Sequence, residues 1–208
     1  MDLHHEFTVN VPVDEAWRVL TDLERIAPCL PGAQLTEVEG ETYRGQVKVK
    51  VGPILAQFKG QASFVSRDDA AHTATLKGEG RDTTGKGNAS AMITAELTAV
   101  DATSTRCVVN TDLSISGKVA QFGRGALADV SDKLLAQFVE NLNQLIASAP
   151  PTPATSAPAP QTGEVRIIDS AEVAPLDLLG TAGAPILKRA IPVIVAAIAI
   201  VVIGVLVF

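Results

Sequence analysis

Residues 42–66 read TYRGQVKVKVGPILAQFKGQASFVS, and this stretch decides the fold. Apolar or small side chains alternate with polar ones on both sides of Gly52 and Pro53, which together mark a turn. An alternation with a period of two is typical of a half-buried β-strand. The stretch therefore predicts an antiparallel hairpin with one apolar face, made of strands at 42–51 and 54–66.

Segments with the same period lie on either side of this hairpin. A first strand is predicted from Leu3 to Val11, and four more at 34–39, 71–80, 86–99 and 104–115. Short helices are predicted at 14–20 and 23–26. From Phe122 to Ala147 the apolar spacing changes to that of one long amphipathic helix. The predicted fold class is α+β, with a seven-stranded curved antiparallel sheet around a long C-terminal helix.

Charge and cysteine content exclude several classes of protein. The chain has 208 residues, 17 Lys and Arg against 23 Asp and Glu, and a formal net charge of −6. This balance argues against a general nucleic-acid-binding protein, which would carry a basic face. Two cysteines, Cys29 and Cys107, exclude a disulfide framework and a four-cysteine zinc site. The N-terminus has no secretory signal pattern, so we expect the main domain in the reducing cytosol.

The composition changes after residue 149, which we take as the end of the main domain. Residues 150–163 read PPTPATSAPAPQTG and offer no side chains for a core. We therefore expect residues 150–189 to form an unstructured Pro-rich linker and juxtamembrane segment. Within it, residues 176–180 resemble a short docking motif for a partner or the membrane surface, and a passive linker is the alternative.

Residues 190–208 contain no charged side chain. As a helix they would rise about 28 Å, close to the roughly 30 Å of a bilayer core, and they predict a single-pass C-terminal transmembrane helix. A buried core helix is the alternative. Lys188 and Arg189 precede the segment, which places the main domain on the cytoplasmic side of the cell membrane. Truncation after Ala149 is then expected to leave a soluble monomer of normal stability.

One face of the predicted sheet is rich in small residues. Aligned by apolar parity, the strands place Gly45, Gly60, Gly78, Gly80 and Ala91 on the face that meets the long helix. Side chains this small underfill the space, so we expect an apolar ligand cavity, and a helix that docks closer is the alternative. The predicted ligand-lining residues are Tyr43, Val47, Val49, Phe58, Phe64, Leu76, Ala91, Ile93, Val109, Leu134 and Phe138.

Four short motifs carry a resemblance to a known family. They are VPVDEAW at 11–17, CLPG at 29–32, KVKVGP at 48–53 with FKG at 58–60, and FGRG at 122–125. With these motifs, residues 1–148 resemble the START-like helix-grip (SRPBCC) superfamily, and more closely the family of the carbon monoxide dehydrogenase G subunit. The resemblance implies a ligand-cavity domain without a shared catalytic set. Members with a similar linker and apolar tail resemble membrane-tethered partners of the molybdenum-containing carbon monoxide dehydrogenase, which passes electrons to respiratory quinone.

No catalytic or metal-binding constellation can be assembled from the sequence. Residues 80–87 read GRDTTGKG, which lacks the final Ser or Thr of a phosphate-binding P-loop and precedes a strand, so a glycine-rich hairpin is predicted. Cys29 has no visible base and is interpreted as a buried thiol. His5 falls on the inward parity, either as a structural histidine or as a hydrogen-bond donor into the cavity. Arg124 is either a solvated residue or an anion contact.

Three functions are compatible with such a domain. The first is a membrane-tethered carrier that extracts a lipophilic quinone, menaquinone or ubiquinone, and delivers it to carbon monoxide dehydrogenase. The second is a recruitment subunit that only holds this enzyme at the membrane. The third, a cyclase- or hydrolase-like enzyme, is disfavoured because the inward faces lack acid–base pairs. We expect a non-enzymatic protein with no covalently bound cofactor and with quinone as its ligand; the resemblance alone implies the quinone and the enzyme partner.

Overall fold

The computed structural model describes residues 1–51, 54–85, 87–117, 124–148, 165–168 and 176–177. The chain begins with β1 (Asp2–Val9), α1 (Val13–Leu20), α2 (Leu23–Ile26) and a short 3₁₀ helix, η1 (Ala27–Cys29). Six strands follow, β2 (Ala33–Glu39), β3 (Thr42–Val51), β4 (Ile54–Asp68), β5 (Thr73–Asp82), β6 (Gly87–Asp101) and β7 (Ser104–Gly117). The last elements are the long helix α3 (Arg124–Ser148) and two short strands, β8 (Val165–Ile167) and β9 (Leu176–Asp177).

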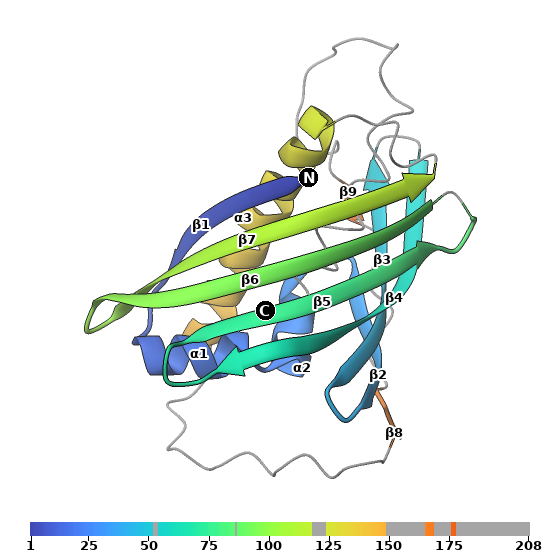
Figure 1. Ribbon diagram of the computed structural model, residues 1–208. Helices are drawn as coiled ribbons and strands as arrows, with labels where there is room; N and C mark the ends of the chain where they lie inside the picture. The colour runs from blue at the N-terminus through green and yellow to red at the C-terminus, as the bar shows by residue number, and fades with distance from the viewer. Residues whose placement is uncertain (52–53, 86, 118–123, 149–164, 169–175, 178–208) are drawn as a thin grey trace.

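The strands form one curved sheet, antiparallel except for β9. Its order is β1-β7-β6-β5-β4-β3-β2-β8, so the first strand pairs with β7. Figure 1 shows β5, β6 and β7 as long neighbours, β2 and β3 turned across one end of the sheet, and α3 behind it. The predicted curved sheet with a C-terminal helix is confirmed, and each element predicted within residues 1–149 begins and ends within two residues of its observed bounds.

The core lies between the sheet and the helices. In β6 every second side chain is buried, namely Ala89, Ala91, Ile93, Ala95 and Leu97. Leu134, Phe138 and Leu142 of α3 are at most 1% exposed. The ring of Phe138 meets that of Phe7 edge-on, with 6.3 Å between centroids. The alternation that predicts the strands is therefore also the pattern that builds the core.

Gly45 and Gly60 lie where neighbouring strands approach too closely for a side chain. A Cβ atom at Gly45 would lie 2.6 Å from the carbonyl oxygen of Gln34, and one at Gly60 would collide with the carbonyl oxygen of Glu79. Glycine permits this approach where a sheet bends. At these two positions, the space predicted to be empty is therefore occupied by the backbone of the next strand.

Two strands come from the segment predicted to be an unstructured linker. β8 pairs with β2, with Glu37 opposite Ile167, and β9 pairs in parallel with Val49 and Lys50 of β3. Within the described residues, the sheet therefore has nine strands instead of the predicted seven. Strands of two or three residues are too short to show a periodic pattern in the sequence. They form because an existing sheet edge supplies their hydrogen bonds.

The predicted anchor, residues 190–208, lies outside the described residues. Most of the predicted linker lies outside them as well. Among the helices that the structure describes, none combines the length and the apolar character needed to cross a membrane. The transmembrane helix and the cell-membrane location stay predictions from the sequence.

Candidate ligand site between the sheet and the helices

A small apolar pocket lies on the inner face of the sheet, between α2 and strands β2 to β4. Its walls are formed by Leu23, Gln34, Leu35, Tyr43, Gly45, Gln46, Val47, Phe58, Gly60, Gln61 and Ala62. Its volume of about 30 Å³ is close to that of one water molecule. The structure therefore brings three of the predicted ligand residues, Tyr43, Val47 and Phe58, together at one hollow.

The predicted set misses Leu23, Leu35 and Ala62. Ala62 has the inward parity and could have been included from the alternation of β4. Leu35 lies next to a bulge between Leu35 and Glu37, which interrupts the alternation of β2. Leu23 belongs to a four-residue helix, which is too short to define an apolar face.

Tyr43, one of the residues that line this pocket, carries a hydroxyl group. Burial, and to a smaller extent the carboxylates of Glu24, Asp22 and Glu41, raises the pKa of the Tyr43 phenol above its usual 10.0. The hydroxyl is therefore protonated at neutral pH. Among the described residues it has no hydrogen-bond partner. A phenolic O–H in apolar surroundings can donate to a carbonyl oxygen of a ligand.

The other predicted ligand residues lie in the packed core or at its edge. Leu76, Ile93, Leu134, Phe138, Ala91 and Val109 are all buried, with at most 6% exposed. Phe64 is half-buried and packs against the same cluster. Val49 lies in β3, and its side chain falls outside the described part of the structure. Except for Val49, these residues therefore lie on the predicted inner side of the sheet, and the contact of the whole set with a ligand stays a prediction.

His5 of β1 contacts two polar residues of α3. Its Nε2 atom lies 3.0 Å from the Ser131 hydroxyl oxygen and 3.3 Å from an Asp132 carboxylate oxygen. Burial lowers the pKa of His5 below 6.5, although Asp132 opposes the shift, so the ring is neutral at neutral pH. Both partners face the same ring nitrogen, so Asp132 cannot orient the imidazole from its far side as a triad requires. We interpret this contact as a structural bridge between β1 and α3.

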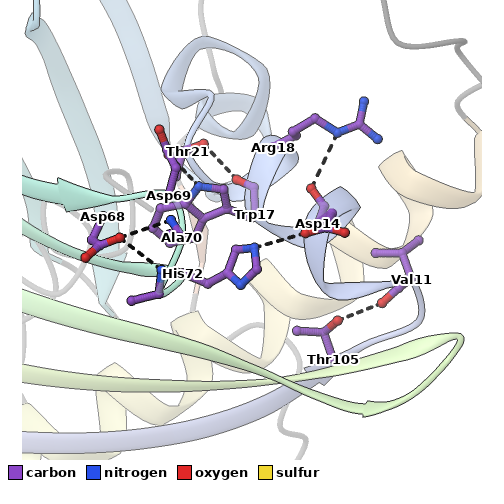
Figure 2. Close-up of polar contacts among 11 residues, drawn as sticks. Val11, Asp14, Trp17, Arg18, Thr21, Asp68, Asp69, Ala70, His72 and Thr105 are labelled. Atoms are coloured by element: carbon purple, nitrogen blue, oxygen red, sulfur yellow. Dashed lines mark hydrogen bonds and ion pairs between the residues drawn. The ribbon is translucent and has the colours of Figure 1, made fainter.

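A cluster around Trp17 joins α1 to the turn between β4 and β5 (Figure 2). The indole Nε1 of Trp17 donates to Asp69 at 2.7 Å, and His72 Nε2 lies 3.1 Å from the Asp14 carboxylate. Arg67 pairs with Asp69 at 2.6 Å and covers the Trp17 ring. Hydrogen bonds from Arg67 and Trp17 hold the pKa of Asp69 below 3.8. The cluster fastens α1 to the sheet, and no sequence pattern indicates it because its partners are more than 50 residues apart.

Both cysteines are buried free thiols. Burial raises the pKa of Cys29, and it raises that of Cys107 to about 12, so neither is a reactive thiolate at neutral pH. The carbonyl of Cys29 accepts a hydrogen bond from Asn141 of α3 at 2.8 Å. This arrangement supports the interpretation of Cys29 as a packing residue. The described part of the chain contains no group of His, Cys, Asp or Glu suited to a metal ion.

The glycine-rich segment after Gly80 is a hairpin, as predicted. It joins β5 to β6, with Gly85 at a φ of +75° and with the Asp82 carboxylate accepting the backbone N–H of Thr84 at 2.9 Å. A strand follows where a P-loop would require a helix. Arg124 is the first residue of α3, and its side chain falls outside the described part of the structure. Leu176 of the candidate docking motif pairs with the chain's own β3, and residues 178–180 lie outside the described residues.

Comparison with solved structures supports the fold. A conserved protein from Geobacillus kaustophilus matches with a TM-score of 0.65 at 20% identity, over 71% of this chain and 95% of the other. Ara h 8.0201 matches with a TM-score of 0.52 at 16% identity, over 71% of this chain and 99% of the other. These likenesses concern the fold alone. The curved sheet with its C-terminal helix is therefore a fold that these solved structures share.

The family follows from the sequence match. The model of the CoxG family, whose members are described as the G subunit of carbon monoxide dehydrogenase, matches residues 6–147, well over half of the chain. The chain therefore belongs to the CoxG family, and the resemblance based on the four motifs is confirmed. No curated protein sequence matches it significantly.

Proposed function

We propose that this protein is a membrane-tethered carrier that takes a lipophilic quinone from the bilayer and presents it to carbon monoxide dehydrogenase. The observation that carries the proposal is the inner pocket, which has an apolar lining and includes Tyr43, whose phenol is protonated at neutral pH. A quinone offers an apolar ring and two carbonyl oxygens, so it matches an apolar wall with one donor. Membership of the CoxG family supports the choice of enzyme partner.

Loading a quinone requires more room than the inner pocket offers. Its volume of about 30 Å³ is far below the roughly 300 Å³ of a typical small-molecule site. The wall at Leu23 belongs to α2, whose four residues carry few backbone hydrogen bonds. We expect α2 to be the element displaced when a ligand enters. Burial of the isoprenoid tail, at about 0.8 kcal/mol per CH₂, offsets the cost of leaving the bilayer.

The segment leading to the predicted anchor docks beside this pocket. Ile168, directly after β8, packs in a cluster with Leu35 and Tyr43, and its N–H donates to the Thr36 carbonyl at 2.9 Å. After β9, twelve residues separate Asp177 from the predicted anchor. A flexible chain of this length spans roughly 20 Å. The tether would therefore hold the pocket side of the domain close to the membrane surface.

A recruitment subunit without ligand transport is the second candidate function. The small volume of the pocket favours it, because a protein that only binds an enzyme needs no space for a ligand. If the protein only recruits the enzyme, variants of the pocket should support electron transfer from carbon monoxide dehydrogenase to quinone at the full rate. The two functions therefore differ in one measurable property, the binding of quinone.

Quinone binding by the full chain tests the carrier directly. Protein purified in non-ionic detergent is extracted and its lipids are identified by mass spectrometry, and a short-chain quinone is then titrated. Ala62→Leu fills the pocket, and Ala74→Leu enlarges an equally buried alanine elsewhere on the inner face as the matched control. We expect Ala62→Leu to weaken quinone binding about tenfold or more and Ala74→Leu to leave it unchanged. Equal affinities in both variants would place the ligand elsewhere.

A further inference from the structure

A second depression crosses β4, β5, β6 and β7, and we call it the outer groove. Its volume is about 590 Å³, and it is lined by Lys59, Gly60, Gln61, Glu79, Gly80, Arg81, Asn88, Ala89, Ser90, Ser114, Ile115 and Ser116. Eight of these residues have the outward parity and form two rows of side chains. The other four, Gly60, Gly80, Ala89 and Ile115, belong to the row between them.

Strand parity assigns the outer groove to the solvent face. If it opened on the inner face, the inward side chains of the adjoining rows, such as Phe58 and Leu113, would line it, and they do not. The side chains of both outward rows do line it. The outer groove and the inner pocket therefore lie on opposite faces of the sheet. The groove spans three strand spacings, about 14 Å.

Positive charge is concentrated at one end of the outer groove. Lys59 of β4 lies directly opposite Arg81 of β5, a like-charge pairing that destabilises a sheet unless an anion covers it. Within the described residues Lys59 forms no ion pair, and Arg81 donates from Nε to the neutral Oδ1 of Asn88 at 3.1 Å. Glu79 is neutralised by Lys77 at 2.6 Å. These cations are exposed on a domain with 19 acidic and 14 basic residues in 1–149.

The opposite end of the outer groove is neutral and rich in hydrogen-bonding groups. Ser90 of β6 and Ser114 and Ser116 of β7 supply hydroxyl groups, and Asn88 lies between them and Arg81. An acidic peptide would meet positive charge at one point only. A ligand with one concentrated negative charge and a polar, hydroxylated remainder fits the whole length.

We propose that the outer groove binds a phosphate ester. The phosphoryl group lies between Lys59 and Arg81, which neighbouring strands hold about 4.8 Å apart, and the hydroxylated substituent extends along the three serines. Two cations match the charge of roughly −1.5 to −2 on a phosphate monoester at neutral pH, and they more than balance the single negative charge of a phosphodiester headgroup. The guanidinium of Arg81 offers paired donors, and the ammonium of Lys59 acts as a point charge. The ester belongs to a phospholipid headgroup or to a soluble molecule. The outer groove and the inner pocket share Gly60 and Gln61 but lie on opposite faces of the sheet.

Acetylation of lysines, followed residue by residue with mass spectrometry, tests this site in the full chain in non-ionic detergent. The probes are glycerol phosphate, micelles containing phosphatidylglycerol, and polyglutamate. Acetylation of Lys59 should slow about tenfold when nine-tenths of the sites are occupied, while Lys133, exposed on α3, reacts at its original rate. Arg81→Gln should remove most of this protection, and Arg18→Gln, which removes an exposed arginine of α1, should not.

Each outcome decides between the alternatives. Protection by glycerol phosphate supports the site with a soluble ester as ligand, and protection by phosphatidylglycerol alone supports it with a headgroup as ligand. Protection by polyglutamate alone would overturn the proposal in favour of an acidic protein partner. Equal protection of Lys59 and Lys133 would overturn it in favour of general charge attraction. No protection by any probe would also overturn it.

Discussion

In the proposed carrier, recognition of a quinone carbonyl depends on the hydroxyl of Tyr43. The side chain is half-buried between the inner pocket and the segment around Ile168. Burial keeps the pKa of this phenol raised, so the donor is retained across the physiological range. Glycine at positions 45 and 60 contributes differently, because it lets the strands bend around the pocket.

Tyr43→Phe removes the donor and keeps the ring. We expect quinone affinity to fall about fivefold, since a net hydrogen bond contributes about 1 kcal/mol. The free energy of unfolding should change little, because the hydroxyl has no partner among the described residues. Titration with a short-chain quinone and urea denaturation measure the two effects. Unchanged affinity would show that the hydroxyl does not face the ligand.

His5 predicts a specific pH dependence of stability. Burial lowers its pKa below 6.5 in the folded state, so the unfolded chain binds the proton more tightly. Stability is therefore complete above pH 6.5 and is lost as the pH falls, by up to about 1.4 kcal/mol per pH unit until the folded pKa is reached. Urea denaturation between pH 5 and pH 8 should show this slope reduced in His5→Gln. In the control His4→Gln, at an exposed position, the slope should persist; an equal slope in all three proteins would contradict the assignment.

At the scale of the elements, β8 and β9 change the expected behaviour of a truncated domain. Truncation after Ala149 removes both strands, the contacts of Ile168, and the ion pair between Arg166 and Glu24 of α2. We expect the remaining domain to fold with a free energy of unfolding lower by about 1–3 kcal/mol. Urea denaturation of the truncated and full chains in the same detergent measures the difference. Equal stabilities would show that the strands contribute nothing, as the sequence alone suggests.

The sequence is sufficient to predict the elements whose apolar side chains recur with a regular period. Seven strands and the long helix follow from alternation and helical spacing, and the packing of the core follows the same alternation. The Trp17 cluster and the pairing of His5 with Ser131 could not be predicted, since each joins side chains far apart in the chain. For the candidate site, Tyr43, Val47 and Phe58 follow from parity, whereas Leu23 and Leu35 depend on a short helix and a bulge.

At the scale of the whole molecule, the proposed carrier combines three parts with separate physical roles. The curved sheet supplies the pocket, β8 and Ile168 pack beside it, and the predicted anchor at 190–208 keeps the domain at the bilayer. A tether raises the local concentration of the domain at both the membrane and a docked enzyme. Transport then requires the pocket in addition to the tether and the enzyme contact, whereas recruitment requires only the last two.

Electron transfer from reduced carbon monoxide dehydrogenase to membrane quinone tests this division most directly. The rate is measured with no added protein, with the full chain, with Ala62→Leu and with Ala74→Leu, after confirming that all three proteins are membrane-bound and bind the enzyme equally. The carrier predicts that the full chain and Ala74→Leu accelerate quinone reduction and that Ala62→Leu lowers the rate towards the value without protein. Full acceleration by Ala62→Leu would contradict the carrier and leave recruitment as the function.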